Sequence, residues 1–292
     1  MFTKMKHSKR IETSLKWFLA LPKIVVIVLF DFRRSRSNKY CKTFGARRFL
    51  VLTPQLFNVQ IVYDRAYKKF IKIYIRDFVD SAVIKQIFTN HDYGLYKLSR
   101  ARELKQFYDE IISNKKIPLI IDCGANGGMA VRYFKETYEA AHVIGIEPDE
   151  ANVRLAIKNN LHNQAVLRLA AIGNSEAKVN IQNKNALHWA YQVEPDVNGD
   201  VEVTTINKLL KEFDQNTYQP FIVKIDIEGF ENNLFEKNVE WIDLFPILII
   251  ELHDWMLPKQ GNSNNFLKAI SKRNRDFSFH GENVFSISNT II

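Results

Sequence analysis

One stretch of the sequence, residues 119–139, constrains the fold more than any other. It opens with three aliphatic residues, passes through Asp122 into a glycine-rich turn, and then repeats apolar residues at helical spacing from Ala130 to Glu139. Glycine permits the tight or left-handed backbone that such a turn requires. The pattern predicts a buried strand, a turn and a helix. This unit presents free N–H groups at the carboxyl end of a parallel strand, where open α/β sheets bind ligands.

The residues of the turn narrow the range of ligands that it could bind. A dinucleotide fingerprint needs the spacing G-x-G-x-x-G, so that the backbone can lie against a pyrophosphate. Aligned on Gly124, the second and third glycines of that pattern would be Asn126 and Met129. We therefore expect a nucleoside without a pyrophosphate, carrying an amino-acid tail. Nineteen positions after Gly128, Glu147 closes an apolar run, and a carboxylate there suits a ribose diol.

Three longer runs carry a resemblance to a known family. Residues 122–128, 145–149 and 223–231 resemble the signatures of the FkbM-type S-adenosylmethionine-dependent methyltransferases. Shorter matches at 171–174, 203–206 and 249–252 extend the resemblance over about residues 118–285. The family has an apolar residue after the asparagine, where this chain has Gly127. Membership implies a class I methyltransferase fold, S-adenosylmethionine as cofactor, and O-methylation, often of a sugar hydroxyl.

The order of elements predicts the fold class and three parts of the chain. After the turn, strands alternate with helices, which indicates an α/β doubly wound, mostly parallel sheet; a closing pair of strands around Gly281 fits an antiparallel edge. Residues 118–292 form the predicted methyltransferase domain. Residues 47–117 form an N-terminal α/β extension, in which Asp80 caps a helix over 80–88. Residues 1–46 form a basic, partly apolar segment.

The charge of the chain is uneven. Residues 1–118 carry 25 Lys and Arg against 9 Asp and Glu, whereas residues 119–292 carry 16 against 23. The basic character therefore belongs to the front of the chain and not to the predicted catalytic part. A basic face can meet nucleic acid, lipid or an anionic polysaccharide. No nucleic-acid-binding module is recognisable there, so a nucleic-acid partner is not expected.

The first residues leave three interpretations open. The apolar run 17–32 is split by Lys23 and flanked by basic residues, while a spanning helix needs about 20 apolar residues. It can be a core element, an anchor on an anionic membrane surface, or a true span. No small-residue cleavage site follows it, which argues against a signal peptide. Cys41 and Cys123 are too few for a disulfide framework, so the predicted location is cytoplasmic, with membrane association as an alternative.

The predicted cofactor site follows from the turn and from the family signatures. Asp122 would orient the cofactor's ammonium group, while the helix start at Gly127 favours its carboxylate. The residues predicted to bind the cofactor are Asp122, Gly124, Ala125, Asn126, Gly128, Glu147, Pro148 and Ala171.

The predicted catalytic residues stand where two strands end. Methyl transfer from a sulfonium is an in-line displacement, so the protein must position the acceptor oxygen and accept its proton. Asp226 and Glu228 follow one strand, and Glu251 and His253 follow the next. We predict Asp226 or Glu228 as the base, with His253 as the next candidate, because histidine titrates near neutrality. These groups could also gather a divalent cation, but no spacing demands one, so no metal is predicted.

Three further side chains are weaker candidates for contact with the acceptor. Lys224 lies in an otherwise apolar strand, where it either contacts substrate or pairs with Asp226 or Glu251 in a structural network. The connection 183–200 is long for a compact domain, and long loops are often functional. Its Trp189 and Tyr191 could stack on a sugar ring, or could fasten the loop to the domain.

The sequence thus predicts an S-adenosylmethionine-dependent O-methyltransferase whose acceptor is a sugar or a glycan-containing molecule. One alternative is a nucleic-acid-directed methyltransferase, and another is a membrane-associated, non-catalytic binding module with a methyltransferase-like fold. A nicotinamide-dependent oxidoreductase is disfavoured by Asn126 and Met129.

Overall fold

A computed structural model describes residues 25, 48–56, 58–161, 165–182, 192–195 and 199–291. The predictions for the apolar run 17–32, apart from Val25, and for Trp189 and Tyr191 fall outside these residues. The chain divides into two compact units, residues 1–91 and residues 92–292, and each is treated by itself.

The first unit contains a three-stranded antiparallel sheet in the order β1-β2-β3. Its strands are β1 (Phe49–Leu56), β2 (Val59–Asp64) and β3 (Lys69–Tyr74). A buried ion pair joins the start of β1 to the end of β2, with Arg48 Nη2 lying 2.8 Å from Asp64 Oδ2. Helix α2 (Phe78–Ile84) follows the sheet and continues into the π-helical turn η2 (Lys85–Thr89).

The predicted cap of this helix was wrong. Asp77, not Asp80, is the N-cap, because Asp77 Oδ1 accepts hydrogen bonds from the N–H groups of Val79 and Asp80 at 2.9 and 3.2 Å. The Asp80 carboxylate is instead held by Arg76, whose Nη2 lies 2.8 Å from Asp80 Oδ1. Both residues are good capping types, and the competing guanidinium decides between them.

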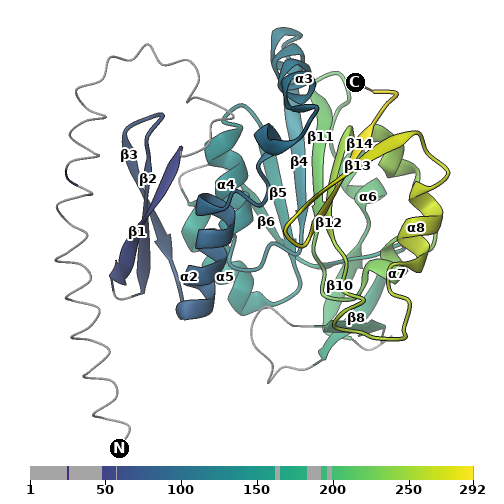
Figure 1. The fold of residues 1–292 in the computed structure, drawn as a ribbon. Helices are drawn as coiled ribbons and strands as arrows, with labels where there is room; N and C mark the ends of the chain where they lie inside the picture. The colour runs from purple at the N-terminus through teal and green to yellow at the C-terminus, as the bar shows by residue number, and fades with distance from the viewer. Residues whose placement is uncertain are drawn as a thin grey trace, which may run out of the picture. The chain divides into compact units, whose positions relative to one another are not determined.

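The second unit is built on a seven-stranded sheet in the order β13-β14-β12-β11-β4-β5-β6 (Figure 1). Its strands are β4 (Ile117–Cys123), β5 (His142–Glu147), β6 (Val166–Leu169), β11 (Tyr218–Ile225), β12 (Ile247–Glu251), β13 (Arg275–His280) and β14 (Asn283–Ser288). The ladders among β12, β11, β4, β5 and β6 are parallel, while β14 is antiparallel to both β12 and β13. The predicted class I methyltransferase fold, doubly wound with an antiparallel strand near one edge, is confirmed.

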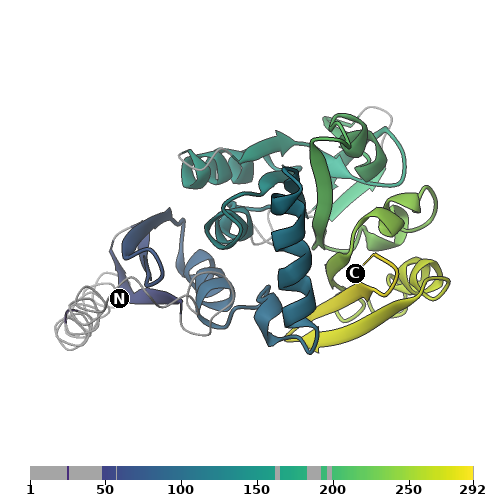
Figure 2. The same cartoon turned by 90° about the horizontal axis from the view of Figure 1, so that it is seen from above.

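Helices lie on both faces of this sheet (Figure 2). One face carries α3 (Ala101–Ser113), α4 (Met129–Thr137) and α5 (Glu150–Asn160), and the other carries α6 (Ile206–Lys211), α7 (Glu231–Leu234) and α8 (Asn264–Ile270). Short 3₁₀ turns occur at η3 (Leu95–Lys97) and η4 (Glu240–Leu244). Because the central strands are covered on both sides, they read as continuous apolar runs in the sequence.

The two faces of the sheet have different cores. On the α6–α8 face, Ile121 and Ile225 belong to one buried cluster with Trp241 and Phe266. The opposite side contains a group of aromatic rings, in which Phe221 contacts Tyr108 and Tyr138 at ring-centroid distances of 5.2 and 5.3 Å. Side chains of β11 thus reach both cores, and Phe221 lies where the pairing of β11 with β4 is irregular, between Pro220 and Ile222.

A smaller four-stranded sheet in the order β7-β10-β8-β9 also belongs to the second unit. Its strands are β7 (Ala171–Ile172), β8 (Ala177–Gln182), β9 (Gln192–Pro195) and β10 (Val201–Thr204). β10 pairs antiparallel with β8 and parallel with β7. Across the parts of the chain that the structure describes, no helix combines the length and the apolar character needed to cross a membrane.

One buried arginine ties the closing hairpin to the rest of the domain, and we expect Arg275→Leu to destabilise the fold. The Arg275 guanidinium donates to the carbonyl oxygens of Ile242, Phe245, Pro246 and Ser286 at 2.9–3.2 Å and to Ser286 Oγ at 2.8 Å. An aliphatic replacement leaves buried carbonyl groups unpaired, each at about 1–3 kcal/mol. Urea unfolding should therefore show a free energy of unfolding lower by about 3 kcal/mol.

The matched control is Lys272→Leu, which removes an exposed cation three positions earlier. It should change the free energy of unfolding by less than about 0.5 kcal/mol. Equal effects of the two substitutions would contradict a structural role for the Arg275 hydrogen bonds.

Candidate active site

The turn after β4 brings its backbone against the end of β11. Gly124 has φ +83°, and a Cβ placed there would lie 1.7 Å from the carbonyl oxygen of Asp226. In the same region the Asp226 N–H donates to the Cys123 carbonyl at 3.0 Å. Gly124 therefore has no room for a side chain, and the backbone of the turn packs directly against the end of β11.

Glu147, at the end of β5, holds the next part of the turn. Its Oε2 accepts the Asn126 N–H at 2.8 Å, and its Oε1 accepts the Asp149 N–H at 3.0 Å and Asn152 Nδ2 at 3.1 Å. Burial raises the pKa of Glu147 above its usual range, although these three hydrogen bonds oppose the shift. A carboxylate offers about four lone-pair sites, so Glu147 keeps acceptor capacity for a ligand hydroxyl.

A pocket that opens to solvent lies at the carboxyl ends of β4, β5 and β11, the edge of the sheet where α/β proteins bind ligands. Five predicted cofactor residues line it: Gly124, Asn126, Glu147, Pro148 and Ala171. Apolar residues complete the wall, among them Ile146, Ile172, Ile227 and Phe230. The residues present fit S-adenosylmethionine, because Glu147 can accept from the ribose and the apolar wall can cover the flat base.

The other predicted cofactor residues support the turn. Ala125 donates its N–H to the Ile146 carbonyl at 2.9 Å and accepts from the Gly128 N–H at 2.8 Å. Gly128 has φ +77° and caps α4. Asp122 is fully buried. Direct contacts of Ala125, Gly128 and Asp122 with the cofactor stay predictions.

Lys224 is buried in β11 and connects three groups around the turn. Its Nζ lies 3.0 Å from Asp122 Oδ1 and 3.2 Å from Asp226 Oδ2, and it donates to the Gly124 carbonyl at 2.9 Å. Burial disfavours the charged amine, but the two carboxylates outweigh it and raise the pKa of Lys224 well above its usual value. The predicted pairing with Asp226 is confirmed, while contact of Lys224 with substrate stays a prediction.

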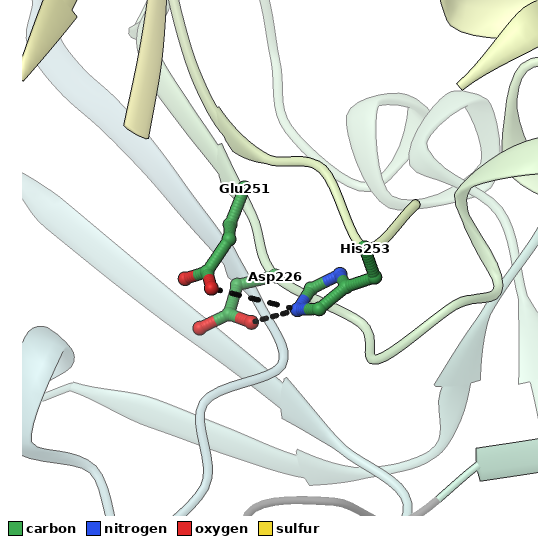
Figure 3. Close-up of side chains that lie close together, drawn as sticks. All are labelled: Asp226, Glu251 and His253. Carbon is green, nitrogen blue, oxygen red and sulfur yellow. Dashed lines mark ion pairs between the residues drawn. The ribbon is translucent and has the colours of Figure 1, made fainter. Parts of the chain in front are cut away.

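The three predicted catalytic side chains lie together, and Glu251 joins them. Figure 3 shows Asp226, Glu251 and His253 pointing toward one another from the ends of β11 and β12. His253 Nε2 lies 3.6 Å from Asp226 Oδ1, 3.4 Å from Glu228 Oε2 and 3.7 Å from Glu251 Oε1. Asp226 and Glu228 also line the pocket, so the cluster borders the predicted cofactor site.

The cluster is tuned to exchange protons near neutral pH. Burial, and then the charge of Asp226, raise the pKa of Glu228 to about 8 and that of Glu251 to about 7. For His253 burial acts to lower the pKa, but the hydrogen bond and charge of Glu231 outweigh it and raise the pKa to about 9. Groups this close titrate together, so the proton belongs to the cluster rather than to one residue.

Glu231 is a site residue to which sequence analysis assigned no role. It is fully buried at the start of α7, and its Oε1 lies 2.8 Å from His253 Nδ1. The same oxygen accepts the N–H groups of Ile227 and Gly229 at 3.3 and 3.4 Å, and Asn262 Nδ2 donates to Oε2. Its place in the 223–231 signature was the only sequence signal, since its contact with His253 joins residues 22 positions apart.

The backbone at Glu228 is unusual. Glu228 has φ +53°, a left-handed conformation that residues other than glycine rarely adopt, and Gly229 follows with φ +99°. Such conformations are concentrated at functional sites, where the surroundings hold them in place. Here the turn directs Glu228 toward both the pocket and His253.

The chain is similar to known methyltransferases in sequence and in fold. A family profile described as Methyltransferase FkbM domain matches residues 122–279. A search of curated proteins found no match. Among solved structures, the O-methyltransferase TomG from Streptomyces achromogenes, involved in tomaymycin synthesis and solved with SAM, is similar at 9% identity and TM-score 0.39, covering 73% of this chain and 91% of that one. A putative O-methyltransferase from Klebsiella pneumoniae is similar at 10% identity and TM-score 0.38, with 73% and 97% covered.

We expect Glu147→Ala to weaken binding of S-adenosylmethionine. The substitution removes the acceptor of the Asn126 N–H and the group expected on the ribose. Loss of such hydrogen bonds costs about 1–3 kcal/mol, which corresponds to a dissociation constant raised about 5- to 150-fold. Isothermal calorimetry measures this change directly.

Glu150→Ala is the matched control, because this exposed carboxylate lies three residues away and pairs with Arg154 on the surface of α5. The dissociation constant of this variant for S-adenosylmethionine should stay within about twofold of that of the unsubstituted protein. Unchanged affinity in Glu147→Ala would show that the ligand does not use this carboxylate.

Proposed function

Because the chain belongs to the FkbM methyltransferase domain family and is an S-adenosylmethionine-dependent methyltransferase, we propose that it methylates a hydroxyl oxygen of a sugar or glycan-containing acceptor. One observation carries the proposal: Asp226 and Glu228 belong both to the lining of the cofactor pocket and to the cluster around His253. Groups able to take a proton therefore lie beside the place where a methyl donor would be held. This supports an acceptor that loses a proton as it is methylated, as a hydroxyl does.

The pocket residues would act mainly by positioning. S-adenosylmethionine supplies an activated methyl group, whose bond to sulfur breaks as a bond to the acceptor oxygen forms. Glu147 would hold the ribose, and the walls of the turn would fix the donor relative to Asp226. Holding the reacting atoms in line contributes much of the rate in such displacements.

The proton of the acceptor hydroxyl would pass to the carboxylate–histidine cluster. Asp226 is fixed by the Cys123 carbonyl through its N–H and by Lys224 through its side chain. It lies beside Glu228, whose pKa near 8 allows a proton to be held and released around neutral pH. A base within hydrogen-bond reach typically contributes about 10²- to 10⁴-fold to such a transfer.

The sugar acceptor is inferred from the family resemblance and from the polar border of the pocket. A polyhydroxylated ring offers several donors to the carboxylates of Asp226, Glu228 and Glu251. Contact of residues 1–46 with an anionic membrane surface stays one of the open interpretations, and the cytoplasmic location and the stacking roles of Trp189 and Tyr191 stay predictions.

We expect Asp226→Asn to lower turnover much more than it lowers cofactor affinity. The amide keeps the shape of the side chain but loses the proton acceptor, so transfer of a labelled methyl group to a panel of sugar acceptors should fall by about 100-fold or more. The dissociation constant for S-adenosylmethionine should change by less than about fivefold, because Asp122 still pairs with Lys224.

Asp243→Asn serves as the control, since this exposed carboxylate pairs with Arg273 near η4. It should transfer methyl groups at the unsubstituted rate. Normal turnover in Asp226→Asn would remove this residue from the reaction, and a protein that binds the cofactor but methylates no sugar would contradict the proposed acceptor class.

A further inference from the structure

The side chains at the ends of β11 and β12 surround a common point. Asp226, Glu251 and His253 each offer one ligand atom, and these three atoms all lie within 4.8 Å of one another. Figure 3 shows them converging from two neighbouring parallel strands. Glu251 is the last residue of β12, Asp226 directly follows β11, and His253 lies two residues beyond β12, where its ring is buried and held by Glu231.

The orientation of His253 gives a second, independent observation. The ring is buried, and its Nδ1 faces Glu231 at 2.8 Å; because a carboxylate accepts hydrogen bonds, Nδ1 carries the proton. Nε2 is thereby turned toward the carboxylates of Glu228, Asp226 and Glu251, at 3.4, 3.6 and 3.7 Å, all longer than an ordinary hydrogen bond. Histidines that bind metals almost always donate their other ring N–H to a carboxylate or a carbonyl.

Glu231 is itself firmly held, as such a supporting residue must be. Its two oxygens accept from the backbone of Ile227 and Gly229 and from the side chain of Asn262. The ring of His253 is therefore fixed in one orientation before any ligand arrives.

The balance of charge also favours a cation. Asp226, Glu228 and Glu251 bring three carboxylates to the Nε2 side of the buried His253 ring. The buried Lys224 lies beside Asp226, but it is shared with Asp122. Carboxylates at this separation repel one another, and a divalent cation among them would relieve the repulsion.

We propose that Asp226, Glu251 and His253 bind a divalent cation of the Mn²⁺ type at the border of the cofactor pocket, with Glu228 beside it and Glu231 orienting His253. One imidazole together with carboxylates suits first-row transition metals better than Ca²⁺, which prefers all-oxygen sites. The sequence analysis named these carboxylates and His253 as groups that could gather a cation but predicted no metal, because the candidate ligands follow no local spacing.

The consequence for catalysis rests on the proposed function. Three protein ligands leave coordination positions open, and a hydroxyl bound to a divalent cation loses its proton more readily. The cation would then select an acceptor that places a hydroxyl oxygen at this border, and the remaining carboxylate, Glu228, would receive the proton.

The test uses the full chain, freed of metals with a chelator, in the absence of cofactor and acceptor. Titration with Mn²⁺, followed by the electron paramagnetic resonance signal of the free ion, should show one saturable site per chain. Glu251→Gln and His253→Gln should each raise the Mn²⁺ dissociation constant at least tenfold, and Glu231→Gln about 10- to 100-fold as a supporting residue. Asp243→Asn, which alters an exposed carboxylate near η4, should leave the Mn²⁺ dissociation constant unchanged.

Each variant is checked for folding by calorimetric binding of S-adenosylmethionine, since neither Glu251 nor His253 is among the residues lining the pocket. Absence of saturable Mn²⁺ binding, or equal binding by Glu251→Gln and Asp243→Asn, would overturn the proposal. Glu251 is partly exposed, so Glu251→Gln keeps the test valid even if His253→Gln fails to fold. Failure of the proposed function is a separate outcome: metal-loaded protein that binds the cofactor but methylates no sugar.

Discussion

The ion pairs of Lys224 are the interaction on which the rest of the site depends. A buried lysine is costly unless its charge is matched, and here Asp122, Asp226 and the Gly124 carbonyl match it together. These partners belong to the end of β4, the end of β11 and the turn between β4 and α4. The Lys224 ammonium group therefore connects the cofactor turn to the catalytic cluster. The position of Asp226 thus depends on the same contacts that shape the turn.

The order of the strands makes this connection possible. β4 is central, with β5 on one side and β11 on the other, so the chain reverses its direction of winding between β4 and β11. Open α/β sheets bind ligands at such a point, because the connections on either side diverge and leave a crevice. The pocket lies there, and β12 places Glu251 and His253 one strand farther along the same edge. Cofactor site and cluster are thus neighbours by topology.

Sequence patterns predicted those features that depend on local structure. The strand, turn and helix around Gly124 and the carboxylate at Glu147 follow from spacing along neighbouring βα units. Glu231 was not predicted because its role depends on His253, 22 positions away in the chain. The error at α2 was local: the helix begins at Phe78, so Asp77 caps it, while Asp80 lies inside the helix and pairs with Arg76 four positions earlier. Propensity ranks both aspartates alike, so only three-dimensional contacts could separate them.

The glutamates of the site illustrate how surroundings assign different roles to one residue type. Glu147 and Glu231 are both buried, and each is occupied by backbone and side-chain donors, so they fix the turn and the ring of His253. Glu228 and Glu251 are partly exposed and have few fixed partners, and for this reason they can exchange a proton or a cation. A carboxylate most of whose acceptor positions are used is suited to orientation, of the protein itself or, at Glu147, of a ligand hydroxyl through the position that is left; one with more acceptors to spare is suited to chemistry. The same distinction explains why Glu231 fixes the His253 ring at Nδ1, while the cluster on the Nε2 side stays open toward the pocket.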